Sequence, residues 1–239
     1  MELSILIPAR NEPYLQKTVD DLKAHIEADT EILVGEDTQP IGQRAMTNRL
    51  AKEAKGRFLL KLDAHVSVGP GFDRILLEQM DERTILAPTL LPLKGESWTT
   101  NGKKQMKQFV FDQHLVMQHA EGEAGETMCL QGSSWVVHKD TYWKWELGDE
   151  SLGSWGSQGV ELGIKAFLNG GRCMTTDKTY YGHVFRHQDS DFPYDRGLEP
   201  GKYANQEMLR RYKNKSIAPL IEKFGYPADW TKESVEALD

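Results

Sequence analysis

The sequence has only two cysteines, Cys129 and Cys173, among its 239 residues. Two thiols are too few for a disulfide scaffold, so buried cysteines in a reducing compartment are expected. No stretch is long and apolar enough for a membrane-spanning helix, and the first residues lack the basic and apolar regions of a signal peptide. These absences predict a cytoplasmic protein.

Basic residues are also fewer than acidic residues. The 29 Lys and Arg residues face 36 Asp and Glu residues, which gives a net charge of -7. This balance excludes a global attraction to nucleic acid or anionic membrane, although a local basic patch stays open. Neither a GxxxxGK loop nor a GxGxxG loop follows the first predicted strand. Phosphate would therefore need another neutralising device, and a metal ion is the obvious one.

The sequence does contain an alternation of strand-like and helix-like segments. Short apolar runs predict strands at residues 3–7, 31–34, 58–62 and 84–87. Helically spaced apolar residues predict intervening helices at residues 13–26, 41–54 and 72–76. This alternation predicts an α/β fold with a mostly parallel central sheet and helices on both faces.

The second half of the chain is less regular. Residues 94–127 are polar and carry no assignable pattern. Beyond them, the pattern predicts strands at 129–137 and 179–185, a helix at 160–167 and a helical tail from Tyr203. No repeat, low-complexity tract or linker interrupts the chain, so a single domain is predicted.

The stretch Phe58–His65 is the first candidate for chemistry. Its buried strand ends in Asp63, and His65 follows two residues later. In an extended chain these side chains point to the same side, at the strand end where ligands collect in open α/β sheets. A carboxylate beside an imidazole suits manganese or a similar divalent ion. The alternative is that the two residues cap the following loop.

His183 is the best candidate for a third metal ligand. It lies three residues before Arg186, whose guanidinium can meet a phosphate through two parallel hydrogen bonds. A hydrogen-bonded core histidine is the alternative. Trp155 beside Gly156 could form a sugar-facing wall, although tryptophans more often simply pack. Asp37 could bind a ribose or base, or could be a turn acid before Pro40.

Several ordered motifs together carry a family resemblance. Ser4–Glu12 looks like an opening strand and loop, Glu36-Asp37 like paired acids after a second strand, and Asp63-Ala64-His65 like an Asp-x-His motif. Gly132-Ser133 lies where the family has two glycines, Trp155–Glu161 resembles Trp-Gly-Gly-Glu-Asn-x-Glu, and Gly182–Arg186 matches Gly-His-Val-Phe-Arg without change. From about residue 3 to 215, the chain resembles the polypeptide N-acetylgalactosaminyltransferases, which have the family A glycosyltransferase fold.

The resemblance implies transfer of a sugar from a UDP-sugar, such as UDP-N-acetylgalactosamine or UDP-glucose, to a hydroxyl with retention of configuration. It implies Mn²⁺, or another divalent cation such as Mg²⁺, on Asp63, His65 and His183. Catalytic roles fall to Glu161, Trp155 and Arg186, and no carboxylate base is obligatory because the leaving diphosphate helps to deprotonate the acceptor. The implied donor contacts are Pro8, Ala9, Arg10, Glu12, Asp37, Arg44, Asp63, Ala64, Gly132, Arg186 and Tyr194.

The chain departs from the family at several positions. Gln158 and Gly159 replace a glutamate and an asparagine, Arg44 substitutes for a missing arginine, and Asp189 stands where the family has a histidine in its mobile lid, here residues 187–197. The lack of an anchor and a lectin domain predicts a compact bacterial or phage relative. Its one domain, 1–239, would comprise a nucleotide-binding half (1–92), an acceptor and metal half with the lid (93–200) and a helical tail (201–239).

The acceptor stays open between a protein Ser or Thr and a hydroxymethylated base in phage DNA. A local basic rim would favour DNA, and a solvated surface is the alternative for the same residues, Lys103, Lys104, Lys107, Arg210, Arg211, Lys213 and Lys215. Two other functions compete. A nucleotidyltransferase would need a glycine-rich basic loop after the first strand, and a non-catalytic nucleotide-sugar-binding module would be favoured by loss of the metal triad.

Overall fold

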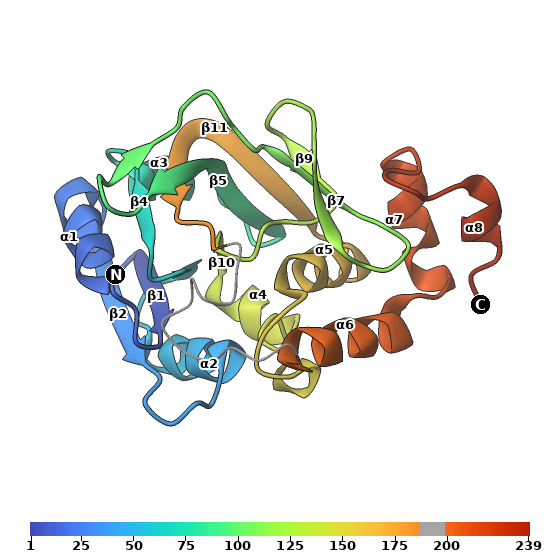
Figure 1. The fold of residues 1–239 in the computed structure, drawn as a ribbon, viewed down its shortest axis with the longest axis horizontal. Coiled ribbons are helices and arrows are strands. Elements are labelled where there is room, and N and C mark those ends of the chain that lie inside the picture. The colour runs from blue at the N-terminus through green and yellow to red at the C-terminus, as the bar shows by residue number, and fades with distance from the viewer. Residues whose placement is uncertain (187–198) are drawn as a thin grey trace.

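The computed structural model describes residues 1–186 and 199–239, which fold around one large β-sheet (Figure 1). Neighbouring strands of this sheet follow the order β2 (Thr30–Glu36), β1 (Leu3–Ala9), β3 (Phe58–Leu62), β10 (Ser134–His138), β5 (Thr84–Lys94), β11 (Arg172–His183) and β4 (Val66–Val68). Two short strands extend it, β6 (Thr99–Thr100) beside β5 and β9 (Glu126–Thr127) beside β11. A separate ribbon pairs β7 (Gln108–Phe111) with β8 (Met117–Ala120).

The sheet is mixed. Strands β2, β1 and β3 run parallel, and β11 runs parallel to β5. Strand β10 lies between β3 and β5 and is antiparallel to both, and β4 is antiparallel to β11. The predicted α/β class is therefore confirmed, with more antiparallel pairing than the βα alternation of the first 92 residues suggested.

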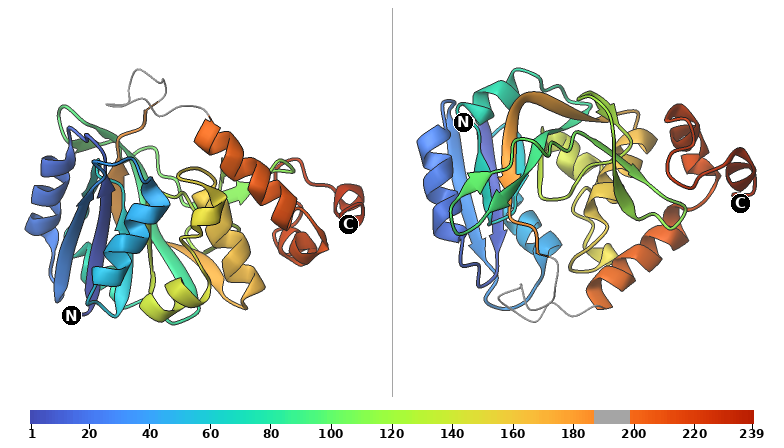
Figure 2. Two further views of the ribbon diagram at one scale, coloured as in Figure 1. Left: turned by 90° about the horizontal axis from the view of Figure 1, so that it is seen from below. Right: turned by 45° about the horizontal axis from the view of Figure 1, so that its top comes forward.

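Helices cover both faces of the sheet, as Figure 2 shows for α1 and α2. On one face, α1 (Leu15–His25) and α3 (Phe72–Leu77) pack Leu22 and Phe72 in the same apolar core as Ile5. On the other face lie α2 (Gln43–Glu53) and α4 (Lys139–Lys144), whose apolar side chains share a second core with Leu6. Alternate residues of β1 point to opposite faces, so a strand buried on both sides reads as a continuous apolar run.

Helix α5 (Gln158–Leu168) is the most deeply buried helix near the centre. Val160 and Ile164 pack in the first core, and Leu162 and Ala166 pack in the second. A helix that is apolar on several sides is expected at such a position. Its N-terminal end lies close to one candidate metal ligand, because Gln158 and Asp63 line the same cavity.

Strand lengths differ from the sequence prediction at two prolines. Strand β5 continues through Pro88 and Pro92 to Lys94 instead of ending before Pro88. Proline has no N–H to donate, and the β5–β11 register shifts between Thr176 and Tyr180, next to the partner of Pro88. The polar stretch 94–127, unassigned from the sequence, contains β6 to β9, and the short elements β4 and α4 were not predicted.

The tail is helical, as predicted. It comprises α6 (Glu199–Tyr212), α7 (Ala218–Lys223) and α8 (Lys232–Glu236), at the right of Figure 1. Trp230 is buried, and its indole Nε1 donates a hydrogen bond to the Phe111 carbonyl at 3.0 Å. This contact fixes the tail to the β7–β8 ribbon. Within the described ranges, no helix combines the length and apolarity that a membrane crossing requires.

Candidate active site

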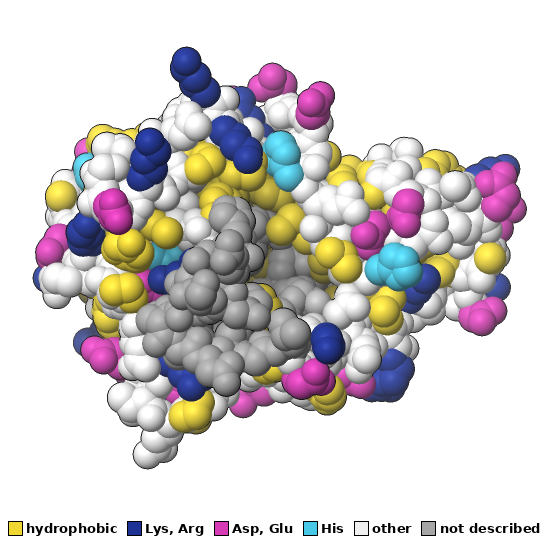
Figure 3. Space-filling view, viewed as in Figure 1, with side chains coloured by type: hydrophobic (Ala, Val, Ile, Leu, Met, Phe, Trp, Pro, Cys, Tyr) yellow, Lys and Arg dark blue, Asp and Glu magenta, His cyan; other side chains and the backbone are white. Residues whose placement is uncertain are grey.

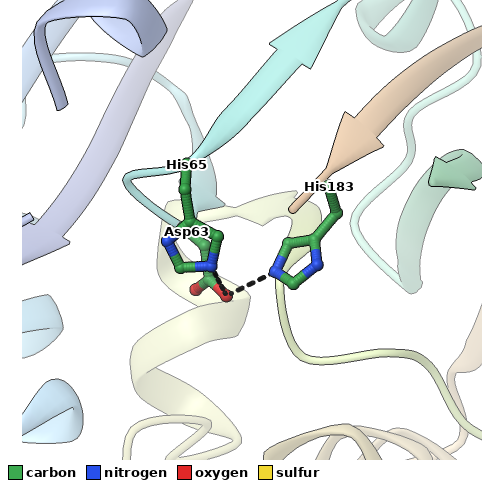
Figure 4. Close-up of side chains that lie close together, drawn as sticks. All are labelled: Asp63, His65 and His183. Atoms are coloured by element: carbon green, nitrogen blue, oxygen red, sulfur yellow. Dashed lines mark hydrogen bonds and ion pairs between the residues drawn. The ribbon is translucent and has the colours of Figure 1, made fainter. Parts of the chain in front are cut away.

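The three predicted metal ligands converge at one end of the sheet (Figure 4). The Nε2 atom of His183 lies 3.2 Å from Oδ2 of Asp63, and Nε2 of His65 lies 3.9 Å from the same oxygen. His183 ends β11, and His65 immediately precedes β4, which pairs with β11. The two imidazoles are therefore neighbours because of strand pairing, with ring centroids 4.7 Å apart.

The side chains of Asp63 and His65 lie close together as predicted, but the extended chain predicted between them is not present. Strand β3 stops at Leu62, and residues 64–65 form a bend that leads into β4. The two side chains meet across this bend and not along one extended strand. Asp63 is held there by a backbone hydrogen bond, in which its N–H donates to the Ser133 carbonyl at 2.8 Å.

Glu12 supports two of the candidate residues. One carboxylate oxygen lies 3.0 Å from Nδ1 of His65, and both oxygens accept hydrogen bonds from Nη2 of Arg186 at 2.7 Å. Burial by itself raises the pKa of Glu12, but His65 and Arg186 outweigh burial and lower it. An ionised carboxylate on Nδ1 directs the His65 Nε2 lone pair toward Asp63, as outer carboxylates do for metal-bound histidines.

The protonation states suit a cation. Burial lowers the pKa of His183 to about 4, so its imidazole is neutral near pH 7. Burial raises the pKa of Asp63, but Lys61 and the two histidines outweigh it and hold that pKa well below its usual range. Near neutral pH the cluster therefore presents a carboxylate and a neutral imidazole, the forms in which these groups bind a metal ion.

The spacing of the donor atoms also fits a divalent ion. One ligand atom from each of the three residues lies within 4.8 Å of the others. Ligands bonded to a metal at about 2.1 Å are separated by roughly 3.0 to 3.5 Å, so closure needs little movement. The buried Nδ1 of His183 has no hydrogen-bond partner. Residues Asp63, His65 and His183 could thus hold a metal ion.

Two cavities meet at Asp63. The first has a volume of about 340 Å³, and its walls include Pro8, Ala9, Arg10, Glu12, Asp37, Ala64 and Arg186. The second has a volume of about 390 Å³, and its walls include Gly132, Gln158 and Gly159. Residues common to both are Gln43, Asp63, Gln131 and Trp155.

Comparisons with known proteins bear on this geometry. No protein-family model matches the chain. A putative polypeptide N-acetylgalactosaminyltransferase 13 of Drosophila melanogaster is 28% identical over 213 residues, which cover 80% of this chain and 38% of the relative. Polypeptide N-acetylgalactosaminyltransferase 5 of Mus musculus is 25% identical over 162 residues, 61% of this chain and 17% of the relative. The chain thus spans less than half the length of these relatives.

Solved structures give the same answer for the fold. GalNAc-T7, solved with UDP, GalNAc and Mn²⁺, superposes with a TM-score of 0.71 over 99% of this chain and 53% of its own, at 17% identity. Residues 1–349 of Staphylococcus aureus TarS, solved with UDP-GlcNAc, superpose with a TM-score of 0.61 over 99% of this chain and 70% of their own, at 16% identity.

The chain has the family A glycosyltransferase fold. It is a distant homologue of the polypeptide N-acetylgalactosaminyltransferases, as the motifs predicted. In this glycosyltransferase fold the candidate metal ligands and most of the predicted donor contacts line connected cavities. Tyr194, Asp189 and the predicted lid, 187–197, lie outside the described residues.

Two predicted site residues are placed elsewhere. The Arg44 and Glu161 side chains are 1% and 0% exposed, form an ion pair at 2.9 Å and do not line either cavity. The buried ion pair gives both side chains a structural role, and the donor contact of Arg44 and the catalytic role of Glu161 stay predictions. Arg44 also donates to the carbonyls of Gly153 and Gly156, at 3.2 and 2.7 Å. The pair thus fixes the loop that carries Trp155 into the cavities.

Asp37 combines both interpretations of its role. Its carboxylate oxygens accept hydrogen bonds from the N–H groups of Ile41 and Gly42, each at 2.9 Å, as a turn acid does. The same side chain lines the first cavity of the glycosyltransferase fold. The turn role is evident from the contacts, and a contact with a nucleotide stays a prediction.

Gln158 and Gly159 lie at the N-terminal end of α5. Gln158 is 6% exposed, and neither its Oε1 nor its Nε2 has a hydrogen-bond partner. Gly159 packs against the chain so closely that a Cβ atom would lie 1.7 Å from the Leu130 carbonyl oxygen. The glycine at this departure from the family motif therefore permits close packing, and the neighbouring Gln158 lines the second cavity.

Three of the seven residues of the predicted basic rim form ion pairs with acidic side chains. Lys107 forms ion pairs with Glu123 at 3.1 Å and Asp177 at 3.5 Å. Arg210 and Arg211 both pair with Glu207, at 2.7 and 2.9 Å. In Figure 3, acidic and basic side chains lie beside one another at the end of the molecule formed by α6 to α8. This mixed surface gives weak attraction to phosphate.

Proposed function

We propose that the chain is a metal-dependent glycosyltransferase that moves a sugar from a UDP-sugar to an acceptor hydroxyl, with retention of configuration. The convergence of Asp63, His65 and His183 on the wall of the first cavity, where Asp63 also borders the second, is the observation that carries the proposal. A divalent ion held there would neutralise charge that develops on the departing diphosphate. Homology to glycosyltransferases over most of the chain supports the reaction class.

The cavities suggest how the donor is arranged. The first cavity would take the uridine and diphosphate, because Pro8, Arg10 and Asp37 lie on its walls. The second would take the sugar and the acceptor, with Trp155 as an apolar wall and Gln158 as a hydrogen-bonding partner. Residues 1–92 and 93–200 would then contribute the two halves of a single catalytic domain.

Arg186 would act on the diphosphate from a fixed position. Its guanidinium pairs with Glu12, which also contacts the metal ligand His65. Glu12 therefore orients both groups toward the same charged part of the donor. A guanidinium held in this way needs no reorganisation when charge develops on the leaving group.

The acidic residues of the cavities favour retention without a carboxylate base. Among the described wall residues, the carboxylates are those of Glu12, Asp37 and Asp63. Each is already engaged, by Arg186 and His65, by backbone N–H groups, or by the histidines and Lys61. Deprotonation of the acceptor by the leaving diphosphate fits this arrangement. The acceptor would be a protein Ser or Thr hydroxyl or a hydroxymethylated base, and the ion pairs of Lys107, Arg210 and Arg211 favour the protein hydroxyl.

The test is hydrolysis and transfer with a panel of UDP-sugars, with and without Mn²⁺. Wild-type protein should release UDP in the presence of the ion, and His183→Ala should abolish this release while circular dichroism shows an intact fold. His138→Ala is the matched control, because His138 is similarly buried but lies at the start of α4, away from the cavities. Equal turnover of the wild type and His183→Ala would refute the proposal.

A further inference from the structure

Lys61 is a fully buried lysine in the middle of the sheet. It lies on β3, opposite Leu6 of β1 and Trp135 of β10, and its side chain is 0% exposed. A charged group at such a position is costly unless it is paired and hydrogen-bonded. Its Nζ atom contacts Oδ1 of Asp63 and donates to the Gly132 carbonyl at 2.8 Å. The lysine thus contacts the candidate metal cluster from within the sheet.

This contact divides the two oxygens of the Asp63 carboxylate between different partners. Oδ1 accepts from Lys61 and, at 3.3 Å, from Nε2 of Gln43. Oδ2 lies near Nε2 of His183 and Nε2 of His65. One oxygen is therefore committed to the lysine, and a single carboxylate oxygen is left on the side of the histidines.

The charges around the cluster cancel in pairs. The ammonium of Lys61 offsets the carboxylate of Asp63, and the guanidinium of Arg186 offsets the carboxylate of Glu12. The other two ligands, His65 and His183, are imidazoles, which add no negative charge. A divalent ion at this position would face a nearby ammonium, and these described residues of the cluster together carry no net negative charge to compensate it.

We propose that Lys61 makes metal binding conditional on the donor: the divalent ion binds weakly to the protein alone and firmly only together with a nucleotide diphosphate. The inference rests on the proposed function and concerns the same site. The diphosphate supplies negative charge to the ion, because Lys61 neutralises the negative charge of Asp63. Lys61 acts through Asp63, so it is a positioning residue rather than a catalytic one.

The direct test is Mn²⁺ binding to the wild-type protein, measured by electron paramagnetic resonance with and without UDP. We expect UDP to tighten Mn²⁺ binding by about tenfold or more, since it removes the uncompensated repulsion. The comparison uses no turnover, so it is independent of the sugar and the acceptor. Equal Mn²⁺ affinity with and without UDP would overturn the inference.

The second test replaces the lysine. Lys61→Met should increase the affinity for Mn²⁺ without UDP by about tenfold, because it removes a positive charge next to Asp63. General damage to the fold would weaken binding, so a gain is specific to the proposed role. Lys61→Gln keeps a hydrogen-bond donor for Asp63 and Gly132 and should give the same gain if Lys61→Met does not fold.

Lys165→Met is the matched control. Lys165 is also buried and paired, with Glu161 at 2.8 Å, but it lies outside the two cavities. Its replacement should leave the Mn²⁺ affinity and its dependence on UDP unchanged. Unaltered or weaker Mn²⁺ binding in folded Lys61 variants refutes the inference and leaves the proposed function standing. Absence of Mn²⁺ binding to the wild type under every condition refutes both.

Discussion

Two buried clusters of charge lie near the centre of this molecule, and their difference separates support from chemistry. The first, called here the Arg44 cluster, consists of Arg44, Glu161, Lys165 and Asp149. The second, called here the Asp63 cluster, consists of Lys61, Asp63, His65 and His183. Both contain an acid and a lysine, residue types that are rarely buried in a protein unless they are paired.

The Arg44 cluster is closed. Glu161 meets Arg44 through one oxygen and Lys165 through the other, at 2.9 and 2.8 Å, and its side chain is 0% exposed. The Asp63 cluster is open. The Asp63 side chain is 21% exposed to the cavities, and the imidazole Nδ1 of His183 has no partner. Both clusters thus contain buried charge. The Asp63 cluster differs in that it borders a cavity and contains a nitrogen atom without a hydrogen-bond partner.

Asp63→Asn should have the largest effect on activity. It removes the one carboxylate among the three ligands, although its amide oxygen can still accept from Lys61. We expect turnover of a UDP-sugar with Mn²⁺ to fall by about 1,000-fold or more. Steady-state UDP release measures the loss, and thermal unfolding controls for the fold. Residual turnover above one tenth of the wild type would show that the Asp63 cluster is not the metal site.

Glu161→Gln should show the opposite profile. It leaves Arg44 buried without a countercharge and Lys165 with Asp149 alone, so the free energy of unfolding should fall by about 3 kcal/mol. Turnover per folded molecule should change by no more than about twofold, since Glu161 does not line either cavity and Arg44 keeps its hydrogen bonds to the Gly153 and Gly156 carbonyls. Urea denaturation and kinetics at low temperature separate the two quantities. Full stability with lost turnover would support a catalytic role for Glu161.

Glu12→Gln tests whether Glu12 orients His65 and Arg186 beside the Asp63 cluster. The neutral amide weakens the hold on both His65 and Arg186, so Mn²⁺ affinity in the presence of UDP should fall by about 10- to 100-fold. Isothermal titration calorimetry measures the change. Glu31→Gln is the control, because that carboxylate is also hydrogen-bonded, by Ser4 and Lys55, but lies on β2. Identical affinities for both variants would contradict an orienting role for Glu12.

The acid stability of the metal-free protein should depend on His183. Its pKa is lowered from 6.5 to about 4 in the folded protein. The unfolded chain therefore binds more protons below pH 6.5, and stability should fall between pH 6.5 and 4, by about 2 kcal/mol at most on reaching pH 5. Denaturation at pH 7 and pH 5 measures this fall. It should be smaller in His183→Ala, and an equal fall in both proteins would contradict the assignment.

Arg210→Glu should have the smallest effect. Arg210 is exposed, pairs with Glu207 and does not line either cavity, so its replacement alters only the surface. We expect neither transfer to a Ser/Thr peptide nor its dependence on salt to change. Transfer to DNA with hydroxymethylated bases that is lost at high salt and on this replacement would instead identify DNA as the acceptor.

The sequence predicted the open cluster much better than the closed one. Asp63, His65 and His183 each stand beside a recognisable strand, and their residue types suit a cation. Glu161 lies in a similarly recognisable motif, yet its partner Arg44 is 117 positions away in the chain. Nothing local indicates that this acid is sealed from solvent, because its burial depends on how α2, α5 and the Trp155 loop pack together.

The fold shows the same limit. Apolar periodicity located β1, α1, β2, α2 and β3, because these elements bury regular faces. The β7–β8 ribbon was not found, since β8 buries none of its residues and β7 buries only two, so neither strand forms an apolar run. The length of β5 was underestimated because a proline usually ends a strand, and only the shifted register with β11 shows how Pro88 is accommodated.

The most direct measurement is X-ray diffraction at the manganese absorption edge from crystals grown with Mn²⁺ and UDP. The account predicts one strong anomalous peak bonded to Oδ2 of Asp63, Nε2 of His65 and Nε2 of His183, with the diphosphate completing the coordination. A manganese peak bonded to other residues, or UDP bound in the cleft with no manganese at the Asp63 cluster, would contradict it.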